Sequence, residues 1–330
     1  MSEYHIPVLL AESVSALVTN PDGTYADATF GGGGHTAAIL SRLNGDGRVI
    51  AFDRDIDAIQ GALKDPRLTL IHNNFRFIEN YAEQLNRSFA AAQDDKQQAA
   101  DGAFARTESF GPAVFDGILA DLGVSSHQFD TADRGFSFRF EDAPLDMRMN
   151  REAALSAAEV VNSYPEEELE RILRLYGEVD GARNMARLIR EARAQAEIRT
   201  TGDLDRAIAR MLPKGAEHKV LAKVYQALRI EVNQEMRSLE KFLEGATRSL
   251  KEGGRLVVIT YHSLEDRMVK NFIKTGNVEG KTEENIYGKV QSPLEAVSRK
   301  PILPAEEEIA ANTRARSAKL RIAERRMQDE

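Results

Sequence analysis

The segment 25–53 constrains the fold of this chain more than any other part of the sequence. An apolar run leads into Gly31–Gly34, an apolar stretch with helical character follows, and a second apolar run ends on the carboxylate of Asp53. Glycines at such a turn let the backbone approach a ligand closely, and a carboxylate at the end of the next strand can accept hydrogen bonds from a ribose. The order strand, glycine turn, helix and strand is therefore typical of a nucleotide-binding α/β domain.

Two further apolar runs, Asp116–Asp121 and Arg255–Tyr261, have the length of buried strands. The segments 167–176, 182–197 and 219–244 instead place apolar residues three and four apart among many charges, which predicts amphipathic helices. Short buried strands that alternate with helices indicate an α/β fold with a mainly parallel sheet.

The helical pattern is densest in the middle of the chain. It predicts a helical subdomain over 140–215, inserted into a main domain formed by 1–139 and 216–330. The helix near 219–244 is expected to return to the main domain. Residues 88–112 are polar and of low complexity, which predicts a disordered surface insertion because the segment has too little apolar area to bury.

Composition narrows the function classes. The 330 residues include no cysteine, which excludes disulfides, thiolate zinc sites and cysteine nucleophiles. The six histidines show no close pair at ligand spacing, so no metal site is expected. No run has the length of a membrane span and the start of the chain lacks a signal pattern, so the expected location is the cytoplasm. The net charge of −8 argues mildly against nucleic acid as a partner.

The nucleotide is only partly specified by the residues themselves. A dinucleotide fingerprint is not met, because Thr36 stands where its last glycine would fall. Asp27 lies four residues before the first glycine, and a carboxylate there suits the cationic ammonium group of S-adenosylmethionine. That cofactor is favoured over a nicotinamide. A plain tight turn at the glycines, and a solvated acid at the end of the strand, remain the alternatives.

Two polar loops follow later strands and are expected at the same edge of the sheet. They are Asp121–Gln128 and Tyr261–Arg267. The alternative for their serines is ordinary helix capping, at Ser125 and Ser126 or at Ser263.

Several segments have the composition of an RNA-binding surface. Aromatic residues alternate with arginines over 134–139, a second arginine loop follows over 144–149, and 314–326 is basic despite the acidic total. A basic helical face would be added by Lys219, Lys223 and Arg229. The alternative for the arginine and aromatic loops is that they are anchored in the core, and the alternative for the basic runs is that their cations simply face solvent.

Together these motifs resemble those of a known protein family. From His5 to Arg321 the chain is similar to the RsmH (MraW) methyltransferases, which make N4-methylcytidine at the decoding centre of 16S rRNA. The matching motifs are Thr29–His35, Ala51–Asp55, Asp121–Gln128, Arg134–Phe138, Pro144–Met149, Tyr225–Ile230 with Asn233, Tyr261–Arg267 and Arg314–Arg321. The departures are the long 88–112 stretch and Thr313, where a proline is common, and neither falls on a cofactor residue.

The resemblance implies a class I methyltransferase sheet with an inserted helical domain, and S-adenosyl-L-methionine as cofactor. It implies 16S rRNA in the small ribosomal subunit as the partner, and it leaves the oligomeric state open, a homodimer included. The residues that match the family's cofactor contacts are Gly33, Gly34, His35, Asp53, Phe75, Asp121 and Gln128.

Methyl transfer to the exocyclic amine of cytosine needs a hydrogen-bond acceptor for that amine but no covalent nucleophile. The candidate acceptors are Ser125, Ser126, Asp146 and His262. A DNA or small-molecule methyltransferase is the rival enzyme, and a non-catalytic RNA-binding module is the rival from another class.

Overall fold

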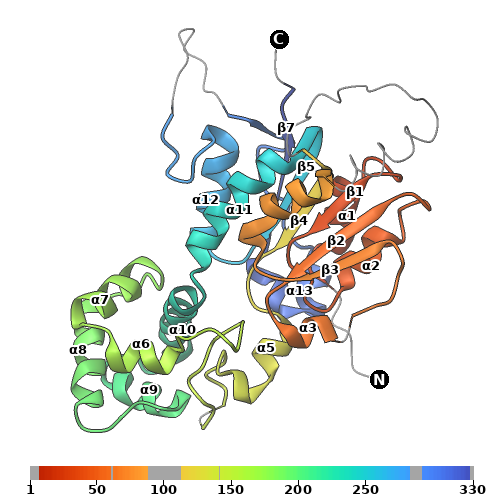
Figure 1. Ribbon diagram of the computed structural model, residues 1–330. Coiled ribbons are helices and arrows are strands. Elements are labelled where there is room, and N and C mark those ends of the chain that lie inside the picture. Colours follow the sequence, from red (N-terminus) through yellow and green to blue (C-terminus); the bar gives the residue numbers. More distant parts are fainter. Residues whose placement is uncertain (1–6, 61, 88–112, 141, 283–291, 328–330) are drawn as a thin grey trace, which may run out of the picture. The chain divides into compact units, whose positions relative to one another are not determined.

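The computed structural model describes residues 7–60, 62–87, 113–140, 142–282 and 292–327, so the predicted insertion at 88–112 lies outside the described residues. The chain divides into two compact units (Figure 1). The first unit comprises Met1–Gly123 with Ser238–Glu330, and the second comprises Val124–Arg237. The second unit therefore begins earlier and ends later than the predicted insert over 140–215.

The described strands of the first unit form one seven-stranded sheet of order β3-β2-β1-β4-β5-β7-β6. They are β1 (Thr24–Asp27), β2 (Arg48–Asp53), β3 (Leu68–His72), β4 (Phe115–Asp121), β5 (Leu250–Thr260), β6 (Leu294–Ala296) and β7 (Lys319–Arg325). The first five strands run parallel, while β7 pairs antiparallel with both β5 and β6. The predicted α/β fold with a mainly parallel sheet is confirmed.

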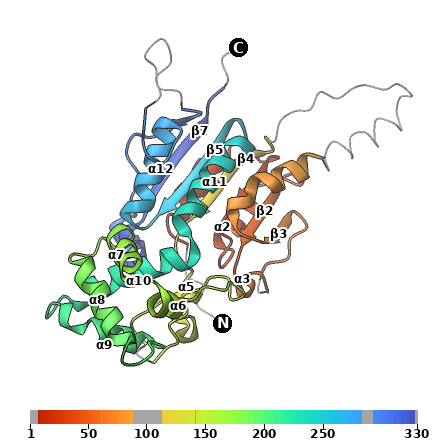
Figure 2. The ribbon, with the colours of Figure 1, turned by 60° about the vertical axis from the view of Figure 1, so that its left-hand side comes forward.

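Helices cover both faces of this sheet (Figure 2). The described helices of this unit are α1 (Leu10–Leu17), α2 (Gly34–Leu40), α3 (Ile56–Gln60), residues 78–87, α11 (Glu235–Ser249), α12 (Ser263–Thr275) and α13 (Glu306–Ala311), with short 3-10 turns at η1 (Phe75–Phe77) and η4 (Thr313–Ser317). Successive residues of a strand face opposite sides. Accordingly, Ile118 packs on the face covered by α11 and α12, whereas Leu119 packs on the face of α1 and α2.

The second unit is helical and has its own core. Its helices are α5 (Ser126–Asp130), α6 (Ala157–Ser163), α7 (Glu166–Leu175), α8 (Ala182–Arg193), α9 (Thr201–Ile208) and α10 (Glu217–Asn233), with 3-10 turns η2 (Ala132–Arg134) and η3 (Ala209–Met211). The buried residues of α7 and α8, such as Leu169 and Met185, recur at the predicted three-to-four spacing. None of the helices in the described part of the chain combines the length and the hydrophobicity that crossing a membrane requires.

One predicted helix, over 219–244, is two helices in the structure. Gln234 adopts a left-handed conformation, with φ of 49°, and ends α10 before α11 begins. Because the apolar period continues on both sides of that residue, the sequence pattern alone did not show the break.

Candidate functional site: an acidic edge of the sheet

The glycine turn joins β1 to α2 and is held by the next strand. The backbone N–H of Gly31 donates to Oδ2 of Asp53 over 2.8 Å, and Phe30 N–H donates to the carbonyl of Phe52 over 2.8 Å. Gly33 has φ of 76°, a backbone conformation that favours glycine. The turn is therefore fixed to the end of β2, and Asp53 lies directly beside it.

The four glycines of the turn have different surroundings. A Cβ on Gly34 would lie 2.3 Å from Cγ of Pro7, and one on Gly33 would lie 2.8 Å from the ring of Phe30. Gly32 is exposed, and a Cβ there would meet no atom within 4 Å. The predicted cofactor residues Gly33 and Gly34 are thus required by packing, and the open side of the turn lies at Gly32.

Asp27 ends β1 as a fully buried carboxylate. Its oxygens accept hydrogen bonds from the backbone N–H of Thr29 at 3.1 Å and from the hydroxyl of Thr36 at 2.6 Å. Burial raises the pKa of Asp27, and the charge of the neighbouring His35 opposes that shift. Burying such a group is costly, so its place at the carboxyl edge of the sheet indicates a binding site.

Asp121 ends β4, which is the neighbour of β1 in the sheet. Its Oδ1 accepts a hydrogen bond from the hydroxyl of Tyr261 at 2.8 Å, and its Oδ2 lies 3.7 Å from Nδ1 of His35. Its backbone N–H donates to Thr29 Oγ1 over 2.7 Å. Burial raises the pKa of Asp121 to about 6, against the opposing effects of His35 and Tyr261.

Asp53 and Phe75 complete this edge of the first unit. Burial raises the pKa of Asp53, although its carboxylate accepts hydrogen bonds from the backbone N–H groups of Gly31 and Asp55. Phe75 begins the 3-10 turn after β3, and its half-buried ring packs edge-on against Phe242 of α11, with centroids 5.2 Å apart. Six of the predicted site residues, Gly33, Gly34, His35, Asp53, Phe75 and Asp121, therefore follow β1, β2, β3 or β4 of one sheet.

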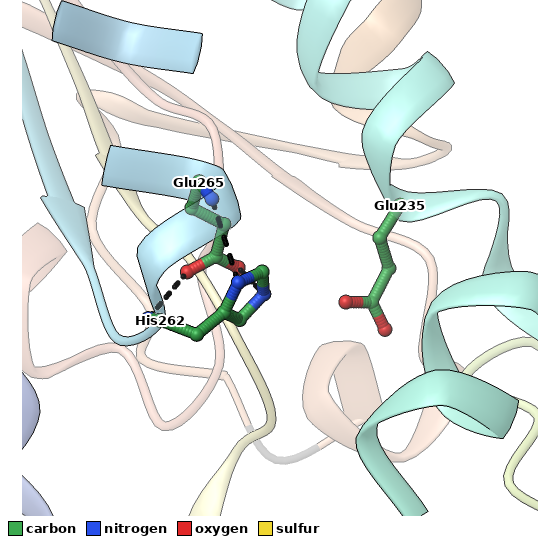
Figure 3. Close-up of side chains that lie close together, drawn as sticks. All are labelled: Glu235, His262 and Glu265. Carbon is green, nitrogen blue, oxygen red and sulfur yellow. Dashed lines mark hydrogen bonds and ion pairs between the residues drawn. The ribbon is translucent and has the colours of Figure 1, made fainter. Parts of the chain in front are cut away.

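His262 also belongs to this unit, directly after β5. It is the N-cap of α12, where its Nδ1 accepts from the backbone N–H of Glu265 at 3.4 Å, while Glu265 accepts from the backbone N–H of His262 at 3.3 Å (Figure 3). Glu235, which Figure 3 also draws, belongs to the second unit and is paired there with Arg229 at 2.9 Å. The role that the structure gives to His262 is helix capping.

The remaining predicted residues lie in the second unit. Ser125 and Gln128 form a reciprocal capping box at the start of α5, with distances of 3.2 Å in both directions, and Ser126 is the first residue of that helix. Asp146 accepts two hydrogen bonds from the guanidinium of Arg148, at 2.7 and 2.9 Å, which lower the pKa of that carboxyl against the opposing effect of burial. The sequence alternative of helix capping is thus realised at Ser125.

The arginine and aromatic segment 134–139 is anchored in the core of the second unit. Arg134 is 2% exposed and donates to the carbonyls of Arg148 and Met149 at 3.1 Å, and Phe136 is buried. Phe138 stacks on His218 with centroids 5.5 Å apart, and Tyr225 covers it edge-on at 5.5 Å. These contacts favour a loop that is anchored in the core over one whose phenylalanines stack on bases.

Two cations of the basic C-terminal segment already form ion pairs within the protein. Lys319 and Arg321 of β7 both pair with Asp266 of α12, at 3.1 and 2.6 Å. Arg316, in the turn before β7, is exposed. The charge of this segment that remains available to an anionic partner is therefore smaller than its composition implies.

The sequence did not single out Tyr261 as a site residue. Its hydroxyl reaches Asp121 across 140 residues of chain, a contact that only the neighbouring positions of β4 and β5 in the sheet create. The one available signal was that polar residues directly follow both strands.

A mainly parallel sheet with acids at the carboxyl ends of neighbouring strands places the protein in the class of nucleotide-binding α/β proteins. The chain belongs to the MraW methylase family, whose pattern it matches over residues 2–326. The predicted cofactor, S-adenosyl-L-methionine, agrees with this membership.

Curated relatives cover nearly the whole chain. Ribosomal RNA small subunit methyltransferase H of Bacteroides fragilis is 52% identical over 323 residues, covering 98% of both chains. The proteins of the same name from Bacteroides thetaiotaomicron and Flavobacterium johnsoniae are 51% and 49% identical, again over 98% of both chains.

Proposed function

We propose that this protein transfers a methyl group from S-adenosyl-L-methionine to N4 of a cytidine in the decoding centre of 16S rRNA. The observation that carries the proposal is the row of carboxylates at the ends of three adjacent strands, Asp53 on β2, Asp27 on β1 and Asp121 on β4, in a chain about half identical to proteins named for small-subunit rRNA methylation. The reaction would take place in the cytoplasm of a bacterium.

The residues present fit this cofactor. Its cationic amino group would be held by the buried Asp27 and the half-buried Asp121, and its ribose by Asp53. The open backbone at Gly32 leaves room for close approach, and Nε2 of His35 is buried without a hydrogen-bond partner among the described residues. A buried polar atom of that kind calls for a partner that a polar ligand can provide.

When bound, the cofactor supplies an electrophilic methyl group on a sulfonium. Nitrogen N4 of cytosine would gain that methyl as the methyl–sulfur bond breaks, leaving S-adenosylhomocysteine, and would release one proton to solvent. The protein must therefore orient the amine and accept its hydrogen bonds. Positioning of this kind contributes several kcal/mol, up to about 7–11 in ideal cases. The candidate acceptors are Ser125, Ser126, Asp146 and His262. The target base must be unstacked to reach the pocket.

The direct test uses unmodified small ribosomal subunits and isotopically labelled S-adenosylmethionine. Nucleoside mass spectrometry should detect N4-methylcytidine in the 16S rRNA and no transfer to duplex DNA or small amines. Transfer to DNA instead would favour the rival methyltransferase, and cofactor binding without any transfer would favour a non-catalytic RNA-binding module. A homodimer stays a prediction, which sedimentation of the same preparation would check.

The acceptor candidates are separated by single-turnover methylation at saturating cofactor. The variants are Ser125→Ala, Ser126→Ala, Asp146→Asn and His262→Ala. Ser156→Ala is a matched control, because Ser156 caps α6 with the same reciprocal pattern, at 3.2 and 2.6 Å to Glu159. Loss of the cap at Ser125 or of the cap at Ser156 should each lower the free energy of unfolding by about 1 kcal/mol. A slower chemical step in Ser125→Ala alone would assign the acceptor role to that serine.

A further inference from the structure

Tyr261 is held at three points directly after β5. Its hydroxyl donates to Oδ1 of Asp121 at 2.8 Å, and its backbone N–H donates to Oε2 of Glu265 at 2.9 Å. Its ring lies against Gly123, whose φ is 108°, and a Cβ at that position would be 3.3 Å from Cδ2 of the tyrosine. The ring therefore has little freedom, and its hydroxyl is aimed at a single carboxylate oxygen.

The carboxylate that it contacts is surrounded by charges from several elements. Asp27 on β1 and Glu265 on α12 both disfavour a negative charge on Asp121, whereas His35 on α2 favours it. Tyr261 itself also faces Glu308 of α13. The Asp121 side chain is 22% exposed, and burial is the largest influence on its pKa. The charge of His35 and then the hydrogen bond from Tyr261 oppose the effect of burial.

Tyr261 is suited to remain a donor in this place. Its own burial, followed by the charge of Asp121, raises the pKa of Tyr261 well above its usual value, so the phenol keeps its proton. A neutral hydroxyl that donates to a carboxylate favours the charged form of that carboxylate. The contact engages Oδ1 and leaves Oδ2 of Asp121 on the side of His35.

We propose that Tyr261 is a positioning residue of the methyl-donor site, which acts through Asp121 by keeping its carboxylate charged and by turning Oδ2 toward the ligand. This inference rests on the proposed function, in which Asp121 contacts the cofactor. The role proposed for Tyr261 is therefore exerted through Asp121 and is not that of a catalytic residue.

The test measures binding of S-adenosylhomocysteine by calorimetry between pH 5 and 8, without any turnover. Wild-type affinity should fall in acid with a midpoint near the pKa of Asp121, about 6. In Tyr261→Phe the ring stays packed on Gly123 but the donor is lost, so the acid limb should move up by about one pH unit. Affinity at pH 6 should then be about fivefold weaker, with little change at pH 8.

Two further variants separate this effect from general loosening. Asp121→Asn should remove the contribution of Asp121 to the acid limb and leave that of Asp27 and Asp53, and Tyr261→Phe in that background should move nothing more. Tyr225→Phe is the matched control, because Tyr225 is a buried tyrosine of the second unit whose hydroxyl also contacts an aspartate, Asp205 at 3.2 Å. It should lower the melting temperature and leave the pH profile of binding unchanged.

The outcomes are distinguishable. If wild-type protein fails to bind S-adenosylhomocysteine, the proposed function itself is lost. If wild type binds but the profile of Tyr261→Phe superimposes on it, or if Tyr261→Phe still moves the acid limb in the Asp121→Asn background, only the role of Tyr261 is overturned. A limb that moves equally in Tyr225→Phe would also overturn it, since the effect would then be one of general stability.

Discussion

The backbone N–H of Gly31 donates to Oδ2 of Asp53, so one carboxylate both holds the glycine turn and borders the proposed ribose site. Its Oδ1 accepts from the backbone N–H of Asp55 at 2.8 Å. The Asp53→Ala variant loses both acceptors and should bind S-adenosylhomocysteine at least about thirtyfold more weakly, corresponding to about 2 kcal/mol. Asp53→Asn keeps one acceptor and should lose less. Calorimetry checks both, and an unchanged affinity in Asp53→Ala would remove the ribose assignment.

Gly34 is expected to tolerate no side chain while Pro7 is in place, because a Cβ there would lie too close to the proline ring. Gly34→Ala should destabilise the protein by about 1–3 kcal/mol through overpacking. Pro7→Ala removes the two ring atoms that lie 2.3 and 3.0 Å from the added Cβ, and the double variant should therefore recover most of the loss. Gly32→Ala, in open space, should leave thermal stability nearly unchanged. Melting temperatures of the three single variants and the double variant, each compared with wild type, test this prediction. A double variant as unstable as Gly34→Ala alone would contradict it.

Asp121 should lower the stability of the folded protein at neutral pH. Its pKa in the folded state is about 6, above the ordinary value of about 3.9 that applies to the unfolded chain. Between these values the folded state binds more protons, so the stability from this group falls as pH rises through the window. Asp121→Asn should thus raise the free energy of unfolding at pH 7.5 by on the order of 1–2 kcal/mol, and the gain should vanish near pH 4.

Asp203→Asn is a control whose effect on stability at neutral pH should have the opposite sign to that of Asp121→Asn. Hydrogen bonds from the backbone at Thr200 and from neighbouring groups lower its pKa to about 2. Asp203→Asn should therefore destabilise the protein at pH 7.5, and this loss should shrink as pH falls from about 3.9 toward 2. Urea unfolding at several pH values measures both variants, and equal pH dependence in the two would contradict the assignments.

Binding to RNA should depend more on Arg316 than on Arg321. Arg321 is 12% exposed and paired with Asp266, whereas Arg316 is exposed. Arg316→Ala should lower the slope of log affinity against log salt by about 0.7–0.9, the effect of one lost phosphate contact. Arg321→Ala should change the slope little while lowering the melting temperature. Titration of a 16S rRNA fragment from low to moderate salt tests the contrast.

The sequence was most informative where contacts are local. The turn at Gly31–Gly34 and the acid at Asp53 lie within one strand–helix–strand unit, and their relation follows from spacing alone. The contact of Tyr261 with Asp121 depends on strand order, which apolar runs do not specify. Asn233 illustrates the same limit, since it accepts from Met149 N–H at 2.9 Å and donates to the carbonyl of Met147 at 2.7 Å, far away in the chain.

The three acids at the carboxyl edge of the sheet have an energetic consequence for the protein without its ligand. Asp27, Asp53 and Asp121 all have raised pKa values, so each resists carrying its charge there. The main cause is burial, and a positively charged ligand offsets the cost of keeping these carboxylates charged as well as adding contacts of its own. The melting temperature at neutral pH should therefore rise far more with sinefungin, which carries an extra amine, than with uncharged methylthioadenosine. Thermal denaturation would then serve as a rapid screen for cationic ligands of this site.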